Sequence, residues 1–168
     1  MIYKNNLALK PVPLNPQEKI YLHIDAIFGY GVSESLLGEK LQFEYSKRTG
    51  RIKNFSIGSE LLATLRPDGG MALTIAGAKI FLTRIQFRKN CVIPNHEALP
   101  FVSEGRSLFC KYVEWCGSNV KVGSDVAIID TNNKVLAVGR ALFGSNSMKK
   151  YHRGVAVKVR EGIKRRIK

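Results

Sequence analysis

The stretch VKVGSDVAIIDTNNKVLAVGRALFG, residues 120–144, contains two apolar runs joined by a short polar turn. DVAIID and KVLAVGRALF have the length and the β-branched content of strands, and the asparagines of TNNK are typical of tight turns. A second polar turn, KVGSD, precedes the first run, and we interpret Asp125 as the residue that ends it. The segment therefore predicts a pair of strands connected by a short loop.

Short strands recur on both sides of this pair throughout the second half of the chain. We expect them around residues 84–93, 107–115 and 154–160. A helical stretch near residues 96–102, which ends at Gly105, and a polar helix over residues 145–152 lie between them. Many short strands at intervals of about 8–12 residues suggest a small β-barrel.

The first half of the chain has a different pattern, which indicates a sheet of consecutive strands. Leu41, Phe43 and Tyr45 alternate with polar residues, which predicts a half-buried strand. A turn that includes Gly50, a residue suited to a left-handed position, leads to the next strand. The short turns GSE and DGG separate two more strands, LLATLRP and MALTIA. We expect a four-stranded antiparallel meander, followed by one or two helical turns near residues 76–82.

The chain before the meander is expected to begin as an extended arm and then to form helices. Apolar residues at helical spacing predict a helix over residues 18–27. A shorter helix over residues 32–37 has Ser33 as its expected N-cap. Prolines restrict the backbone and interrupt helices, so the opening of the chain is expected to be extended around Pro11, Pro13 and Pro16.

The charge balance points to a polyanionic partner. The chain has 27 Lys and Arg against 13 Asp and Glu, a formal net charge of +14. Net charge bears on solubility and association rather than on fold, and nucleic acid is the commonest polyanion for a protein this basic. An anionic membrane surface is the second reading, and a basic composition without such a partner is the third.

The sequence contains no motif of a catalytic, metal or cofactor site. The acidic residues are scattered singly, and no nucleophile–base motif or phosphate-binding glycine loop occurs. Cys91, Cys110 and Cys116 form no C-x-x-C pair, so buried thiols in a reducing compartment explain them better than zinc. No apolar run is long enough to cross a membrane or to form a signal peptide. We expect a cytoplasmic protein that is not an enzyme, does not bind a membrane and needs neither a metal nor a cofactor.

The basic residues of the second half fall where they can meet a ligand. In GVAVKVREG, the valines share one face of the strand, and Lys158 and Arg160 share the other. Gly105, Arg106 and Ser107 lie where a helix is followed by a strand, and a glycine there can leave backbone amides free for phosphate. For each charge taken singly, a solvated surface is the alternative reading.

Three runs of the second half, FVSEGRSLFCKYV, VKVGSDVAIIDTNNKVLAVGRALFG and RGVAVKVREG, together resemble a PUA domain, a small pseudo-barrel that binds RNA. The resemblance covers about residues 85–163. The run FGYGVSESLLGEKLQFEYSKRTGRIKNFSIGSELLATLRPDGGMALTIAGA resembles the pre-PUA domain of archaeal tRNA-guanine transglycosylases, the enzymes that begin archaeosine synthesis. SKRTGRI and LLATLRPDGG are its most distinctive parts.

The resemblance implies an α+β protein of two domains. Residues 1–88 would form a pre-PUA domain with the antiparallel meander sheet, its helices and the extended arm, and residues 89–168 a PUA pseudo-barrel. The full-length enzymes place a large barrel with catalytic aspartates and a zinc site ahead of these domains, and this sequence has neither. The resemblance therefore implies a non-catalytic RNA-binding protein directed to tRNA. It would be free-standing, or the detached subunit of a split enzyme with a separate catalytic transglycosylase chain.

Two other functions stay open. One is a factor that binds ribosomal RNA or is otherwise associated with translation. The other is a stand-alone enzyme of RNA modification.

In this family, the PUA module grips the end of the tRNA acceptor stem and the 3′ single strand with the loop after its first helix and with its last strand. The motifs SEGRS and RGVAVKVR supply the corresponding residues, which are Ser103, Gly105, Arg106, Ser107, Arg153, Lys158 and Arg160. Secondary contacts to the RNA backbone are expected from Lys47, Arg48, Arg51, Lys53, Lys149 and Lys150. We expect Phe101 and Phe109 in the core, so that no aromatic platform for bases exists and sequence specificity is weak.

Overall fold

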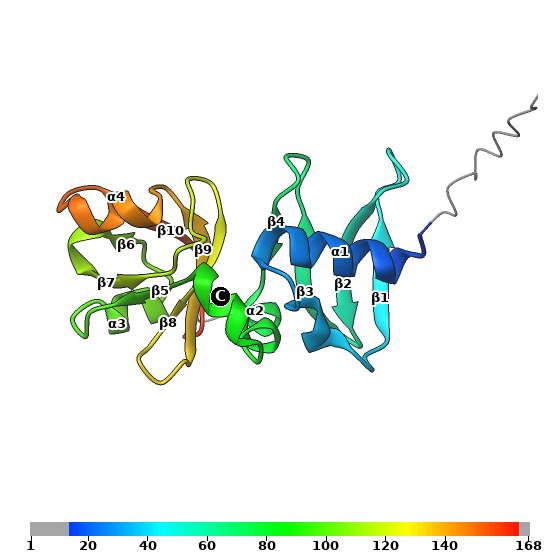
Figure 1. The fold of residues 1–168 in the computed structure, drawn as a ribbon, viewed down its shortest axis with the longest axis horizontal. Coiled ribbons are helices and arrows are strands. Elements are labelled where there is room, and N and C mark those ends of the chain that lie inside the picture. Colours follow the sequence, from blue (N-terminus) through cyan, green and yellow to red (C-terminus); the bar gives the residue numbers. More distant parts are fainter. Residues whose placement is uncertain (1–13, 165–168) are drawn as a thin grey trace, which may run out of the picture.

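The computed structural model describes residues 14–164 and shows two lobes that lie side by side (Figure 1). The first lobe holds a four-stranded antiparallel sheet with helices, and the second a six-stranded, nearly closed, barrel-like sheet. This arrangement confirms the predicted α+β class, with the meander first and the pseudo-barrel second.

The first lobe contains the predicted meander. Its elements are α1 (Pro16–Phe28), the 3₁₀ turn η1 (Ser33–Leu36), β1 (Leu41–Tyr45), β2 (Ile52–Ile57), β3 (Glu60–Leu65), β4 (Met71–Leu73) and α2 (Ile75–Phe81). The strands pair antiparallel in the order β1-β2-β3-β4. Gly50, between β1 and β2, has φ +64°, which confirms the left-handed turn.

Helix α1 begins earlier than predicted because its first residues form a capping box. Asn15 Oδ1 accepts a hydrogen bond from the Glu18 amide at 2.8 Å, and the Glu18 carboxylate accepts one from the Asn15 amide at 3.2 Å. Pro16 is therefore the first helical residue, where a missing N–H costs nothing, and it does not belong to an extended arm. The remainder of the predicted arm lies outside the described residues.

The second predicted helix is a single 3₁₀ turn, and Ser33 is not its N-cap. Ser33 is the first residue of η1, and no side chain caps this turn. The Ser33 amide donates instead to the carboxylate of Asp25, at 2.8 Å. Because the acceptor Asp25 lies in α1, the residues next to Ser33 do not indicate this hydrogen bond.

The second lobe holds the remaining elements. They are η2 (Ile85–Asn90), β5 (Cys91–Pro94), α3 (Leu99–Ser103), β6 (Leu108–Phe109), η3 (Cys110–Tyr112), β7 (Val113–Cys116), β8 (Asp125–Ile129), β9 (Val135–Ala141), α4 (Ser145–Lys150) and β10 (Val155–Gly162). The strand order is β6-β10-β9-β8-β5-β7. Strands β5 and β8 pair parallel, and the other pairs are antiparallel.

Two predicted strands of this lobe are wrong in their extent. Residues 84–93 form mostly the 3₁₀ helix η2, and residues 107–115 form two strands separated by η3. β6 pairs with β10, whereas β7 pairs with β5 at the other edge of the sheet. The chain changes partner strand between Phe109 and Val113 to close the barrel, and this change interrupts the strand.

One hydrophobic cluster extends across both lobes. It runs from Ile20 and Ile24 in α1, through α2, to buried residues of β8 and β9. The rings of Phe28, Phe81 and Phe87 pack against one another in this cluster, with centroids 5.3–5.7 Å apart. A second cluster fills the barrel. Because α2 lies at the junction (Figure 1), the lobes are packed against each other and are not joined by a free linker.

A buried amide network also joins the lobes. Asn90 Nδ2 donates to the Phe28 carbonyl at 2.7 Å. Asn119 Nδ2 donates to Asn90 Oδ1 at 2.6 Å and to the Ile27 carbonyl at 3.1 Å. These bonds satisfy carbonyl groups at the C-terminal end of α1 and hold that end against the barrel.

The three cysteines are buried free thiols, as predicted. Burial raises the pKa of the Cys91 thiol to about 12 and that of Cys116 to about 11, so both stay protonated near neutral pH. Within residues 14–164, no three His, Cys, Asp or Glu side chains gather where they could hold a metal ion. No helix in this range is long and apolar enough to cross a membrane.

Candidate nucleic-acid interface

The loop between α3 and β6 carries three of the predicted site residues, Gly105, Arg106 and Ser107, and the end of α3 holds its backbone. Gly105 has φ +93°, and its amide donates to the Val102 carbonyl at 2.9 Å. The Arg106 amide donates to the Phe101 carbonyl at 3.0 Å. Strand β10 passes so close that a Cβ at Gly162 would overlap the backbone of Gly105. The amides of Gly105 and Arg106 that we expected to be free are therefore occupied, and Gly105 has a backbone role.

Ser103 does not face a ligand. It is 4% exposed, and its hydroxyl donates to the Leu99 carbonyl at 2.7 Å. Its own carbonyl accepts a hydrogen bond from the Lys164 amide at 2.8 Å. Ser103 thus ties the segment after β10 to α3, and we remove it from the side chains proposed to contact RNA.

The two phenylalanines expected in the core lie at the surface. Phe101 is 50% exposed and Phe109 46% exposed. Their neighbours Val102 and Leu108 take the buried positions instead. The prediction was wrong because α3 and β6 are too short for a periodic pattern to show which side faces inward.

Arg106 and Phe101 form a stacked pair at this surface. The guanidinium carbon of Arg106 lies 5.2 Å from the centroid of the Phe101 ring, and the Arg106 side chain is 68% exposed. Glu104 approaches Arg106 only at 3.8 Å. Aromatic rings and guanidinium planes are the surfaces on which unpaired bases stack, so the pair is an aromatic platform that carries a positive charge.

Strand β10 brings a second predicted cation to the same loop. β6 runs antiparallel to β10, with Leu108 opposite Val157, so Ser107 and Arg106 lie beside the later part of β10. Lys158 is exposed there and lies opposite Arg140 of β9. The pairing therefore places the backbone of Ser107 beside that of Lys158, and the Phe101–Arg106 pair lies where α3 leads into β6.

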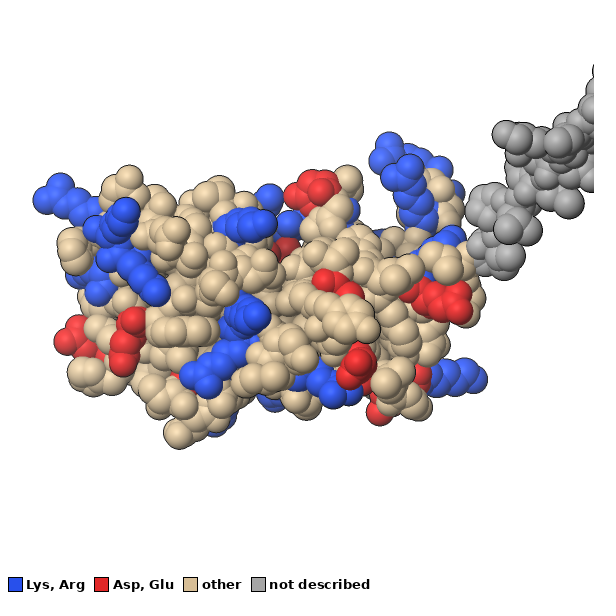
Figure 2. Space-filling view, in the orientation of Figure 1, with Lys and Arg blue, Asp and Glu red and all other residues tan. Residues whose placement is uncertain are grey.

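Arg153 lies at the other end of β10 and belongs to a different group. It precedes Gly154, whose carbonyl accepts a hydrogen bond from the Cys110 amide at 3.0 Å. Lys149 and Lys150 are exposed at the end of α4 nearby in the chain. Figure 2 shows Lys and Arg side chains gathered around α4, at the outer end of the barrel.

Arg160 is engaged between the lobes. Its Nη1 atom lies 3.2 Å from Asp125 Oδ1, and its Nη2 atom donates to the Leu73 carbonyl. Arg66, which follows β3, binds the other carboxylate oxygen of Asp125 at 2.7 Å. Asp125 is 3% exposed, so it is the buried anchor of a contact among β8, β10 and the first lobe. Asp125 does follow the turn, as the first residue of β8, but its contact with the two arginines was not predicted.

Two opposing effects act on the Asp125 carboxyl group. Burial raises the pKa of Asp125, and the guanidinium groups of Arg66 and Arg160 oppose this shift. The sequence carries no local signal for the cluster, because its members belong to three elements that are distant along the chain.

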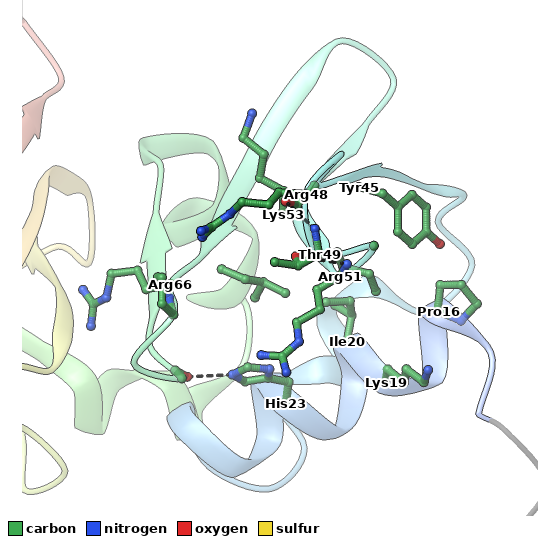
Figure 3. A pocket seen from close by; sticks show the side chains of 16 residues that line it. Pro16, Lys19, Ile20, His23, Tyr45, Arg48, Thr49, Arg51, Lys53 and Arg66 are labelled. Carbon is green, nitrogen blue, oxygen red and sulfur yellow. Dashed lines mark hydrogen bonds between the residues drawn. The ribbon is translucent and has the colours of Figure 1, made fainter.

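The predicted cations of the first lobe also divide into different environments. Lys53 pairs with Glu44 at 2.9 Å, and this hydrogen bond lowers the pKa of Glu44. Arg48, Arg51 and Lys53 line a groove between α1 and the β1–β2 hairpin (Figure 3), whereas Lys47, in the same turn, does not.

Comparison with known families identifies both parts of the chain. Residues 91–163 match the PUA domain, and residues 20–87 match the patch-forming domain C2 of tRNA-guanine transglycosylase. The chain is therefore a PUA-domain protein, and the PUA domain is an RNA-binding module. With its C2 domain, the chain is homologous to the C-terminal region of archaeal tRNA-guanine(15) transglycosylase.

Curated relatives and solved structures agree with this assignment. The tRNA-guanine(15) transglycosylase of Methanobrevibacter smithii is 33% identical over 149 residues, 88% of this chain and 23% of the relative. That of Methanosphaera stadtmanae is 31% identical over 164 residues, 95% of this chain and 24% of the relative. The chain thus spans about a quarter of the length of these relatives.

Two solved structures share the whole arrangement. A hypothetical protein from Pyrococcus horikoshii OT3 superposes with a TM-score of 0.69 at 19% identity, over 91% of this chain and 94% of the other. A conserved PUA domain protein from Thermoplasma acidophilum superposes with a TM-score of 0.63 at 17% identity, over 88% of this chain and 91% of the other. At these identities the likeness concerns the fold.

Proposed function

We propose that this protein binds RNA without acting on it chemically, and that its RNA is tRNA, held at the end of the acceptor stem and at the unpaired 3′ end. The observation that carries the proposal is the exposed Phe101–Arg106 pair on the PUA barrel, just before the strand β6 that pairs with β10. A net charge of +14 supports a polyanionic ligand. Relatives named tRNA-guanine(15) transglycosylase support tRNA as that ligand.

The geometry suggests different roles for the residues of this surface. Phe101 and Arg106 would stack on an unpaired base, while Ser107 and Lys158 would contact phosphate or 2′-hydroxyl groups next to it. Arg153, with Lys149 and Lys150, would make further phosphate contacts at the outer end of the barrel. Arg160 and Gly105 would act by positioning, because their groups are engaged inside the protein.

We also propose that the protein works with a separate catalytic transglycosylase chain. The curated relatives are about four times as long as the segment that they share with this chain, which covers 23% of the first relative. In this arrangement the present protein would hold the tRNA, and the partner chain would carry out the chemistry.

The dependence of tRNA binding on salt tests the RNA-binding proposal. A protein that makes roughly 6–10 phosphate contacts loses about 10³–10⁵ in affinity for duplex nucleic acid between 50 and 200 mM salt. We expect a steep loss of this kind in a filter-binding titration with deacylated tRNA, and weaker binding to a DNA duplex of similar length. Affinity for tRNA that does not change with salt would contradict the proposal.

A further inference from the structure

The first lobe contains a preformed groove that is separate from the PUA surface. It lies between α1, the β1–β2 hairpin and the β3–β4 turn, and it has a volume of about 830 Å³ (Figure 3). Ile20, Ile52 and Leu65 supply its apolar lining. Volumes of about 300–1,000 Å³ are typical of pockets that hold small organic ligands.

The Lys, Arg, Asp and Glu residues that line the groove are all of one sign, positive. Five of its lining residues are Lys or Arg, and none is Asp or Glu: the cations are Lys19, Arg48, Arg51, Lys53 and Arg66. Two of them are neutralised, because Lys53 pairs with Glu44 and Arg66 pairs with Asp68 and Asp125.

The other three cations have no acidic partner in the part of the chain that the structure describes. Among residues 14–164, no carboxylate forms an ion pair with Lys19, Arg48 or Arg51. All three are exposed. Figure 2 shows Lys and Arg side chains standing together over the tip of the hairpin. Like charges that crowd one groove repel each other, and an anionic ligand would relieve that repulsion.

The walls of the groove are held in place by hydrogen bonds. His23 of α1 donates from Nε2 to the Gly69 carbonyl at 2.8 Å, which fixes α1 to the β3–β4 turn (Figure 3). In the opposite wall, the Gly50 amide donates to the Ser46 carbonyl at 2.8 Å. The Ser46 amide donates in turn to the Arg51 carbonyl at 2.9 Å. The backbone that carries Arg48 and Arg51 is therefore a hydrogen-bonded turn, which lowers the cost of ordering this wall when a ligand binds.

An aromatic side chain marks one end of the groove. Tyr45 is 47% exposed and lies above Pro16 in Figure 3, at the end away from Arg66. Its ring offers a face on which a base can stack. The groove thus combines an aromatic ring, an apolar lining and unpaired cations, which match the base and the phosphate of a nucleotide.

We propose that this groove binds one unpaired nucleotide of the bound RNA. The phosphate lies among Arg48, Arg51 and Lys19, and the base lies over the apolar lining toward Tyr45. A paired nucleotide would present only phosphate and sugar and would leave the apolar lining uncovered. The inference rests on the proposed RNA-binding function, and it adds a second contact on the other lobe, at a fixed distance from the PUA surface.

Three variants of the full chain test the inference by fluorescence titration with a short oligouridylate and with tRNA. Arg51→Ala is expected to weaken binding of both about tenfold, since it removes a phosphate contact inside the groove. Tyr45→Ala is expected to weaken binding of the oligouridylate about fivefold through loss of stacking. Lys40→Ala is the matched control, because Lys40 is an exposed cation of the same lobe that does not line the groove and is not among the predicted RNA contacts. Its effect is expected to be less than about twofold.

The outcomes separate this inference from the function on which it rests. Equal effects of Arg51→Ala and Lys40→Ala would overturn the inference, because only the overall charge would then matter. An RNA duplex that competes with the oligouridylate as well as unlabelled oligouridylate does would overturn the assignment to an unpaired nucleotide. In either case, a wild-type protein that still binds tRNA would leave the proposed function standing. A wild-type protein that binds neither RNA would overturn both.

Discussion

Asp125→Ala is expected to lower the free energy of unfolding by about 3 kcal/mol, because it leaves two guanidinium groups without their shared buried partner. Asp125 is 3% exposed and binds Arg66 at 2.7 Å and Arg160 at 3.2 Å. We expect the lower end of the usual range for a broken buried pair, since the Arg160 side chain is 40% exposed. For a domain of this size the loss corresponds to a decrease in Tm of roughly 6–12 °C.

Thermal and urea unfolding of Asp125→Ala and of Asp68→Ala give the matched comparison. Asp68 belongs to the same cluster, through Arg66 at 3.0 Å and Arg140 at 3.3 Å, but its side chain is 48% exposed. Exposed ion pairs contribute about 0–1 kcal/mol to stability. The free energy of unfolding of Asp68→Ala is therefore expected to be much closer to that of the wild type. If the two variants unfolded at the same denaturant concentration, Asp125 would not be the anchor of the lobe contact.

Phe101→Ala is expected to weaken binding of tRNA roughly 5- to 150-fold, the range that corresponds to the 1–3 kcal/mol of one base stacked on an aromatic ring. Arg106→Ala removes the other half of the stacked pair and is expected to have a similar effect. The affinity of the double variant for tRNA should fall by less than the product of the two single effects. The two side chains act as a pair, because the guanidinium carbon of Arg106 lies 5.2 Å from the centroid of the Phe101 ring. Arg106→Lys keeps the positive charge but not the planar guanidinium group. Its affinity for tRNA is therefore expected to lie between those of Arg106→Ala and the wild type.

Titrations with deacylated tRNA at fixed salt measure these effects, and Tyr30→Ala serves as the control. Tyr30 is an aromatic residue of the first lobe and is 88% exposed, outside both proposed RNA contacts. It tests whether the loss of any exposed ring weakens binding. If Phe101→Ala bound tRNA with the same affinity as the wild type and Tyr30→Ala, the proposed stacking platform would be refuted.

Local patterns in the sequence were sufficient for most elements of the fold. The alternation around Phe43 and the glycine of the hairpin turn predicted the meander, because both signals lie within a few residues of the strands that they define. The strand predicted over residues 84–93 was wrong in most of its length, since η2 lies there instead. Its polar residues Arg88 and Asn90 make contacts that depend on other elements, with Trp115 and with the end of α1.

The candidate site was predictable to a smaller extent. The motif resemblance pointed to the α3–β6 loop and to β10, and in the structure β10 pairs with β6, the strand that follows this loop. It could not show that Ser103 is buried or that Phe101 is exposed, because α3 has five residues and its orientation is set by the barrel. The Arg66–Asp125–Arg160 cluster was missed for a related reason, since tertiary contacts alone bring its members together.

The account's central claim is that the PUA surface of this protein holds the unpaired 3′ end of a tRNA. The most direct measurement compares the dissociation constants of the full chain for an intact deacylated tRNA and for the same tRNA without its unpaired 3′ nucleotides. We predict that the truncated tRNA binds about tenfold more weakly to the wild type, as expected for the loss of a stacked base. The Phe101→Ala variant should hardly distinguish the two RNAs. Equal affinity of the wild type for both RNAs would contradict the claim.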